Sequence, residues 1–314
     1  MATRTQSLEA PADLQHKPTS LWRDALGRLV KNRLAVVGGI IVVILVFLAV
    51  FGPFLTPWNY AAQDLKSVAA NHNAPVPPLK FGHLFGTDNL GHDLFSRLLD
   101  GTRISMTVAL VVQVVVLFIG IPIGAAAGWF GGRIDNLLMR FTDVVYAFPD
   151  LLFVILLSVS LKDTWFGNAM VGLLLVFVAI GVVAWVTMAR IVRGQILSLK
   201  ETEYVEAARA IGVSDFKIVT RHMLPNAIGP VIVAVTLGIP AAILTEAVLG
   251  FLGIGANPPR ASWGTLINTG SQWMSSTPHL LVFPALAIAI ALLSFTFLGD
   301  GLRDALDPKL RGKQ

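Results

Sequence analysis

The stretch EAARAIGVSDFKIVTRHMLPN, residues 206–226, carries charged side chains along most of its length. It lies between two segments, residues 170–189 and 228–252, that are each apolar enough and long enough to cross a bilayer. Because a charged side chain is costly in hydrocarbon, this stretch must lie outside the membrane and connect two spans. Its turn signals indicate that it is folded, and they predict two short helices.

The first helix is predicted from a start signal and a stop signal. Ser198 and Glu201 have the spacing of a capping box, which predicts a helix over residues 199–211. Gly212 then supplies a left-handed stop. The two alanines on one face of this helix leave room for another backbone or a bulky side chain. That face consists of Tyr204, Ala207, Ala208 and Ile211.

The second helix is predicted to follow the turn directly. Ser214 is placed to cap it, and Asp215 suits its positive N-terminal end. Pro225 is expected to end it before the next span begins. The sequence therefore predicts a helix-turn-helix hairpin over residues 198–225 with a surface suited to docking. The alternative is a solvated helical loop without a partner.

Composition extends this picture to the whole chain. Hydrophobic residues make up 54% of the 314 residues and charged residues only 14%, whereas soluble domains carry about 25% charged residues. An all-α, polytopic membrane protein with about six transmembrane helices is therefore predicted, since six segments approach or exceed the roughly 20 apolar residues that a span needs. They are residues 34–55, 104–130, 137–161, 170–189, 228–252 and 280–298.

The distribution of lysine and arginine predicts the orientation, because these residues concentrate on the cytoplasmic side of membrane proteins. Six precede residue 34, six fall between Arg190 and Arg221, and four follow Asp300. The loop 56–103 holds four, which four acidic residues balance. Both termini and the hairpin are therefore expected in the cytoplasm, and loop 56–103 is expected outside.

The predicted spans divide the chain into five parts. These are a cytoplasmic N-terminal segment (1–33), the first transmembrane helix (34–55), an extracytoplasmic loop (56–103), a five-helix core domain (104–303) and a cytoplasmic tail (304–314). Proline and glycine in the loop predict an ordered cap or an irregular loop, with a short helix over residues 94–99. The nearly uncharged loop 251–280 is expected to pack at the membrane interface or to re-enter it.

The spacing of residues in the hairpin resembles the cytoplasmic signature of the permease subunits of ATP-binding-cassette importers. In that signature E-A-A is followed by three residues, G, nine residues and I-x-L-P. This chain departs from it at His222, which occupies the isoleucine position. The matching residues are Glu206, Ala207, Ala208, Gly212, Leu224 and Pro225.

The resemblance covers nearly the whole chain. Four further stretches are similar to the C-type subunit of dipeptide and oligopeptide importers, in which a histidine before the final x-L-P-N is usual. They are FGTDNLGHDLFSRLLDGTRISMTVAL (85–110), GGRIDNLLMRFTDVVYAFPDLL (131–152), EAVLGFLGIGANPPRASWG (246–264) and FLGDGLRDALDPKLR (297–311).

The resemblance implies a coupling role for the hairpin. In this family it inserts into a cleft of a separate ATPase subunit and passes the opening and closing of the nucleotide dimer to the spans. The residues implied in coupling are Tyr204 and the six that match the signature. For Glu206 a charge-assisted bond is expected, either to the ATPase or within the chain.

The resemblance also implies partners and a location. The partners are a homologous second permease subunit, two ATPase subunits that bind ATP and magnesium, and an extracytoplasmic solute-binding protein. The location is a bacterial or archaeal plasma membrane, where the chain contacts membrane lipid. The implied substrate is a dipeptide or oligopeptide, and nickel chelates and glutathione stay open as alternatives.

Other chemistry has little support in the sequence. No G-x-x-x-x-G-K-[ST] phosphate loop occurs, so no ATP site, and no other cofactor site, is expected in this chain. The histidines lack metal-ligand spacing, so no metal site is expected and the loop histidines are expected to face solvent. The basic residues form no single patch, which argues against nucleic-acid binding. No nucleophile motif is present, and we expect no enzymatic activity.

Four ionisable residues fall within or beside the predicted spans. Such groups usually face a cavity or a partner, because their burial in lipid is costly. Arg140 and Asp143 are three residues apart, and we expect them to form an ion pair with each other. Asp150 and Glu246 are candidates for the translocation path, with a contact to another subunit as the alternative for each.

Two classes of protein compete with an importer permease. A self-sufficient secondary transporter or channel would show broken helices in inverted repeats and acids at mid-membrane. Here only Asp150 and Glu246 fit the second feature, no repeat is visible, and the hairpin would have no role. A scaffold or receptor would carry an appended soluble domain, which this sequence does not show.

Overall fold

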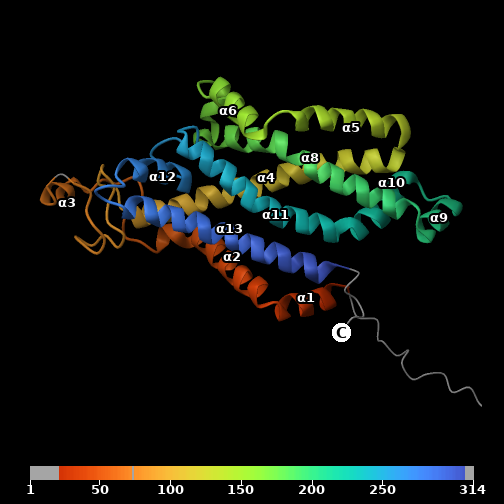
Figure 1. Cartoon of the computed structure of the whole chain (residues 1–314), viewed down its shortest axis with the longest axis horizontal. Helices are drawn as coiled ribbons and strands as arrows, with labels where there is room; N and C mark the ends of the chain where they lie inside the picture. The colour runs from red at the N-terminus through yellow and green to blue at the C-terminus, as the bar shows by residue number, and fades with distance from the viewer. Residues whose placement is uncertain (1–20, 73, 308–314) are drawn as a thin grey trace, which may run out of the picture.

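Among the residues that the structure describes, five helical segments are long and apolar enough to cross a membrane. The computed structural model describes residues 21–72 and 74–307, so residues 1–20 of the predicted N-terminal segment and 308–314 of the predicted tail lie outside the described residues. Figure 1 shows the long helices, such as α4, α8, α11 and α13, running roughly along one axis. The five segments are Arg33–Phe54, Leu94–Phe130, Trp165–Lys200, Asp215–Phe251 and His279–Leu306.

The secondary structure of the described residues is helical, apart from three isolated bridges in loop 56–93. The named helices are α1 (Leu21–Lys31), α2 (Arg33–Phe51), α3 (Leu65–Ala70), α4 (Leu94–Phe130), α5 (Gly132–Ala147), α6 (Asp150–Leu161), α7 (Trp165–Asn168), α8 (Leu173–Lys200), α9 (Glu203–Ala210), α10 (Asp215–Lys217), α11 (Leu224–Phe251), α12 (Trp263–Gln272) and α13 (His279–Leu306). Helix α3 lies at one end of the long axis and α9 at the other (Figure 1). We call these the cap end and the hairpin end.

The third predicted span, residues 137–161, is not one straight helix. It consists of α5 and α6, whose axes are bent by 79° at a short break. Phe148 and Pro149 have extended backbone there. Proline lacks an N–H and disfavours helical backbone in the residue before it, which explains the break. The prediction of about six spans is confirmed for the described residues, with the bent pair of α5 and α6 counted as one span.

The most extensive packing between two helices is that of α4 against α8. Gly120, Gly124 and Gly128 lie on the side of α4 that faces α8, with a spacing of four residues. A Cβ atom placed on Gly124 would lie 2.3 Å from the backbone oxygen of Ala189. The two backbones therefore approach each other at van der Waals distance, as small-residue stripes permit in membrane helices.

The other spans assemble around this pair. Helix α13 packs against α2 and α11, and α11 also contacts α4 and α8. At the hairpin end, α1 contacts α13, and the Arg28 guanidinium donates a hydrogen bond to the backbone oxygen of Asp307 (3.3 Å). Helix α1 falls within the predicted cytoplasmic segment 1–33, for which no helix was predicted.

The two long loops are ordered at the cap end. Helix α4 begins at Leu94, so the predicted short helix over residues 94–99 is the first part of α4, and the loop before it ends at residue 93. In the loop 251–280, α12 packs against α11, α13 and α4, with Trp263 fully buried beside Gly101. Whether α12 lies at the membrane interface or re-enters the membrane stays a prediction.

Candidate functional sites: the hairpin, the cavity and the cap

The first helix of the hairpin begins later than predicted. Helix α8 continues to Lys200, and α9 starts only after Thr202. Ser198 therefore lies inside α8, and the predicted capping box with Glu201 is wrong. The reason is tertiary packing, since Ile196 is buried in the contact with Gly128 and the Lys200 ammonium donates to the backbone oxygen of Trp129 (2.6 Å).

The turn of the hairpin has the geometry that the sequence predicts. Gly212 has φ +79°, in the left-handed region. Its N–H donates to the Arg209 oxygen (2.9 Å), and the N–H of Val213 donates to the Ala208 oxygen (3.0 Å). These two bonds form a Schellman motif, which satisfies the last carbonyl groups of α9 and fixes the direction of the chain that follows.

The second helix of the hairpin does not end at Pro225. Helix α10 continues through a π-helical segment, Ile218–Met223, into α11, so it forms the first turns of a span. Pro225 follows the π-helical segment directly, and its missing N–H leaves one bond of this continuous helix unmade without ending it. The prediction that Pro225 terminates this helix is therefore wrong. Ser214 stands at the predicted cap position, but its side chain accepts no capping bond.

The hairpin surface is apolar at its tip. Ile211 is 81% exposed and Phe216 is 77% exposed, whereas Val205 and Ala208 are buried against the chain itself. The predicted common face of the first helix is thus divided, because Ala208 points inward. Of the other predicted coupling residues, Leu224 is half-buried, and the exposed ones are Tyr204, Glu206, Ala207, Gly212 and Pro225.

Contacts within the chain hold the hairpin in place. The Arg209 guanidinium lies 4.5 Å from the centroid of the Trp129 ring on α4. The amide of Asn226 donates to the Tyr204 hydroxyl (3.3 Å). The carboxylate of Glu206 has no hydrogen bond or ion pair with any described residue, so the intrachain bond considered for it is not observed.

The charges on α5 pair with α8 and not with each other. The Arg190 guanidinium donates to the Asp143 carboxylate (2.8 Å), and the Arg193 guanidinium donates to both oxygens of Asp135 (2.5 and 2.6 Å). Arg140 is exposed and forms no ion pair within the described chain. The predicted pair between Arg140 and Asp143 is therefore wrong, because the neighbouring helix offers Asp143 a better-placed cation.

A cavity of about 420 Å³ lies between α4, α6, α8 and α11. Its wall is mostly aliphatic, and its polar lining residues are Gln113, Asp150, Thr187 and Thr245. The volume falls in the range of roughly 300–1,000 Å³ that is typical of small-molecule sites. Asp150 stands at the first position of α6, after the break that Pro149 causes.

Glu246 does not line this cavity. It lies on α11, is 1% exposed, and accepts a hydrogen bond from the Ser105 hydroxyl of α4 (2.8 Å). The side chain therefore joins two helices inside this chain. Contact of Glu246 with another subunit stays a prediction.

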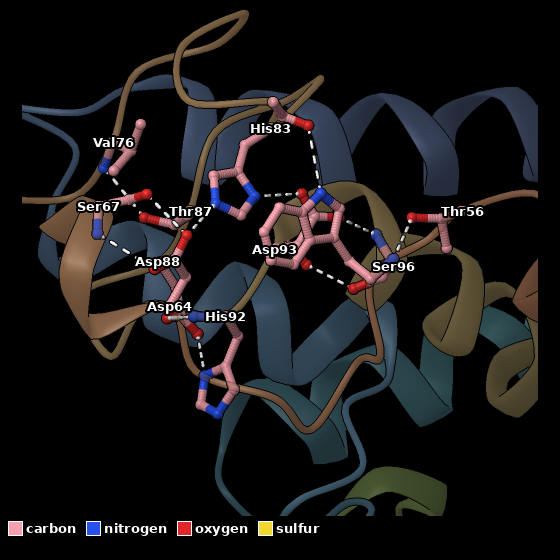
Figure 2. Close-up of polar contacts among 12 residues, drawn as sticks. Thr56, Asp64, Ser67, Val76, His83, Thr87, Asp88, His92, Asp93 and Ser96 are labelled. Carbon is pink, nitrogen blue, oxygen red and sulfur yellow. Dashed lines mark hydrogen bonds and ion pairs between the residues drawn. The ribbon is translucent and has the colours of Figure 1, made fainter.

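The cap is formed by residues 56–93, and a buried network of charges holds it together (Figure 2). His83 is fully buried, with Nδ1 2.9 Å from Asp93 and Nε2 3.3 Å from Asp64. The two carboxylates also accept backbone N–H bonds at the starts of α4 and α3, respectively. One histidine thus ties together two helix N-termini, contrary to the expectation that the loop histidines face solvent.

Hydrogen bonds and charges in the cap favour ionised carboxylates. The pKa of Asp64 lies below its ordinary value, chiefly because the side chain and backbone of Ser67 donate to it and also because His83 lies beside it. Burial alone would raise the pKa of Asp88, but the bonds from His92 and the charge of Arg97 outweigh it and lower this pKa. The cap is therefore held by carboxylates that stay charged at neutral pH.

A second contact fastens the cap to the spans. The Arg260 guanidinium, in the loop before α12, donates to the buried Asp100 carboxylate of α4 (2.6 Å). The same guanidinium lies 4.9 Å from the centroid of the Tyr60 ring in the cap. Three segments that are far apart in the sequence are thus joined by one side chain.

Comparison with known families follows the same division of the chain. Residues 120–312 match the family model described as "Binding-protein-dependent transport system inner membrane component". Residues 20–75 match the model described as "N-terminal TM domain of oligopeptide transport permease C". The second match thus covers α1, α2 and α3, which precede the α4–α8 pair.

Several curated proteins are similar along nearly their whole length. The oligopeptide transport system permease protein OppC of Bacillus subtilis is 43% identical over 298 residues, which cover 95% of this chain and 93% of that protein. The dipeptide transport system permease protein DppC of the same organism is 43% identical over 308 residues, 98% of this chain and 92% of that protein. The glutathione transport system permease protein GsiD of Pectobacterium atrosepticum is 38% identical over 290 residues, 92% of each chain.

Among solved structures, the fold is similar to a chain of the MetNI methionine ABC transporter in an inward-facing conformation. The TM-score is 0.53 with 19% sequence identity, and the match covers 66% of this chain and 94% of that chain. At this identity the likeness concerns the fold alone.

Proposed function

Because this chain belongs to the family of binding-protein-dependent transport system inner membrane components, we propose that it carries dipeptides or oligopeptides. As a member of this family it is a multi-pass inner-membrane permease component and not an enzyme. The proposed substrate class is supported by the 43% identity of this chain to OppC and DppC over nearly its full length. Glutathione, itself a small peptide, is the second candidate, supported by the 38% identity to GsiD.

The partners proposed are those that an importer of this kind requires. A solute-binding protein delivers the peptide to the cap end, and two ATPase subunits dock at the hairpin end and bind ATP and magnesium. A homologous permease subunit completes the path across the membrane. The apolar tip formed by Ile211 and Phe216 supports docking of the ATPase subunits at the hairpin end, because exposed aromatic and aliphatic side chains at one tip are typical of docking surfaces.

Orientation follows from the same assignment. The hairpin end, with the six basic residues between Arg190 and Arg221, lies in the cytoplasm together with both termini, and the cap lies outside. The lack of cysteine allows a direct test with single cysteines. We expect an impermeant maleimide to label Ala69→Cys, on the exposed side of α3, in sealed right-side-out membranes, and to label Ser214→Cys only after permeabilisation. The reverse labelling pattern would place the hairpin outside and remove its proposed role.

The proposed function predicts ATP-driven uptake by the assembled importer. In proteoliposomes that hold the complete complex, a labelled dipeptide should accumulate only when ATP is present on the ATPase side and the solute-binding protein on the other. The purified chain alone should hydrolyse no ATP above background, since it has no phosphate loop. Accumulation by this chain alone, without ATP, would instead support a secondary transporter.

A further inference from the structure

The cavity between α4, α6, α8 and α11 has one ionisable side chain in its lining, that of Asp150. The carboxylate is exposed, and no described residue forms an ion pair with it. The break at Pro149 turns the chain so that Asp150 opens α6, where the positive end of the helix favours a negative charge. The cavity thus presents a single, unneutralised negative charge to whatever enters it.

A second polar group in the same lining also lacks a partner. Gln113, on α4, is 5% exposed, and no hydrogen bond to its amide occurs within the described chain. It lies against Gly238 of α11, where an added Cβ would come 2.7 Å from the amide oxygen. Since no described group bonds this amide, its donor and acceptor are available to water or to a ligand in the cavity.

The rest of the lining is mostly apolar. The other residues are mostly valine, isoleucine, leucine and alanine, so the wall offers a solute few other polar groups. The other acid considered for the path, Glu246, is buried elsewhere and already accepts a bond from Ser105. The negative charge available to a solute in this cavity is therefore that of Asp150.

We propose that this cavity binds the free N-terminal end of a peptide in transit, with the Asp150 carboxylate receiving the α-ammonium group and the Gln113 amide bonding the first peptide group. This inference rests on the proposed peptide substrate. It adds that the permease itself, and not only the binding protein, distinguishes a free amino terminus from a blocked one. An ammonium is a hydrogen-bond donor and a cation, and Asp150 is an acceptor and an anion, so the pair is charge-assisted.

The first experiment measures the charge preference of the cavity without a peptide. Thr187→Cys places the one cysteine of the chain in the lining, and its reaction rates with a cationic (ethylammonium) and an anionic (ethylsulfonate) methanethiosulfonate are compared in the purified complex. We expect Asp150→Asn to lower the cationic-to-anionic rate ratio by about tenfold, since one unit charge nearby acts oppositely on the two reagents. Asp150→Glu should retain the ratio. Asp163→Asn, an exposed carboxylate outside the cavity, is the matched control.

The second experiment uses peptides. A dipeptide with a free amino terminus should protect the cysteine from modification, whereas its N-acetylated form should protect about tenfold less, and Asp150→Asn should abolish this difference. Uptake by proteoliposomes is measured in parallel. Equal protection by both dipeptides, or an unchanged rate ratio in Asp150→Asn, would overturn the inference. If dipeptide uptake were normal in that case, the proposed function would still stand. Absence of any dipeptide uptake by the unmodified complex would overturn the proposed function and the inference together.

Discussion

Gly212→Val is expected to weaken the association of this chain with its ATPase subunits by about tenfold and to lower uptake accordingly. Gly212 has φ +79° in the Schellman turn, a conformation that costs an L-residue about 1–2 kcal/mol, and a β-branched one more. Because about 1.4 kcal/mol corresponds to a factor of ten in affinity, this strain is enough to disrupt docking. The spans are untouched, so the chain should still insert. Co-purification and uptake measure the effect.

The control for this variant is another glycine near the hairpin end. Gly194 lies on α8 with ordinary helical backbone and, like Gly212, has no atom within 4 Å of an added Cβ. Gly194→Val should therefore leave association nearly unchanged. If Gly212→Val kept full association and full uptake at normal membrane levels, the turn would not be required for coupling.

Gly124→Ala is expected to destabilise the fold strongly. The added Cβ would lie 2.3 Å from the Ala189 backbone oxygen, so α4 and α8 would have to separate along their whole contact. Overpacking of this kind typically costs about 1–3 kcal/mol, and a backbone atom cannot move aside as a side chain can. Thermal unfolding of the detergent-purified chain should shift to lower temperature, with a lower folded yield.

The same substitution on a different span tests this explanation. An added Cβ on Gly39 of α2 would touch a single atom of Leu298 at 3.6 Å, an ordinary contact. Gly39→Ala should therefore leave the unfolding temperature close to that of the unsubstituted chain. Equal destabilisation by both substitutions would show that close packing of α4 on α8 is not what makes Gly124 sensitive.

The sequence predicted the parts of the fold that depend on local signals. Apolar runs placed the spans, and the turn at Gly212 followed from one glycine after a short helix, since a left-handed stop needs only its own residues. Two further local signals were present but were not used for a prediction. A proline inside an apolar run, such as Pro149, favours a break or a kink, and the glycines at 120, 124 and 128 favour a close helix contact.

The sequence did not predict what depends on residues distant in the chain. Helix α8 continues past Ser198 because α4 packs against it, which no local pattern records. Asp143 has Arg140 three residues away, yet it pairs with Arg190 of another helix. His83 contacts Asp64 and Asp93 only in the folded cap, and no pattern of neighbouring residues predicts these contacts.

Cross-linking shows whether the tip of the hairpin docks on an ATPase subunit. Ala207→Cys, exposed on α9, carries a short photoreactive label in the assembled complex, and Ala69→Cys on the cap carries the same label as a control. We expect a covalent adduct between the Ala207→Cys chain and an ATPase subunit, and none from Ala69→Cys. An adduct from the cap position, with none from the hairpin in a complex active in uptake, would mean that the hairpin is not the docking site.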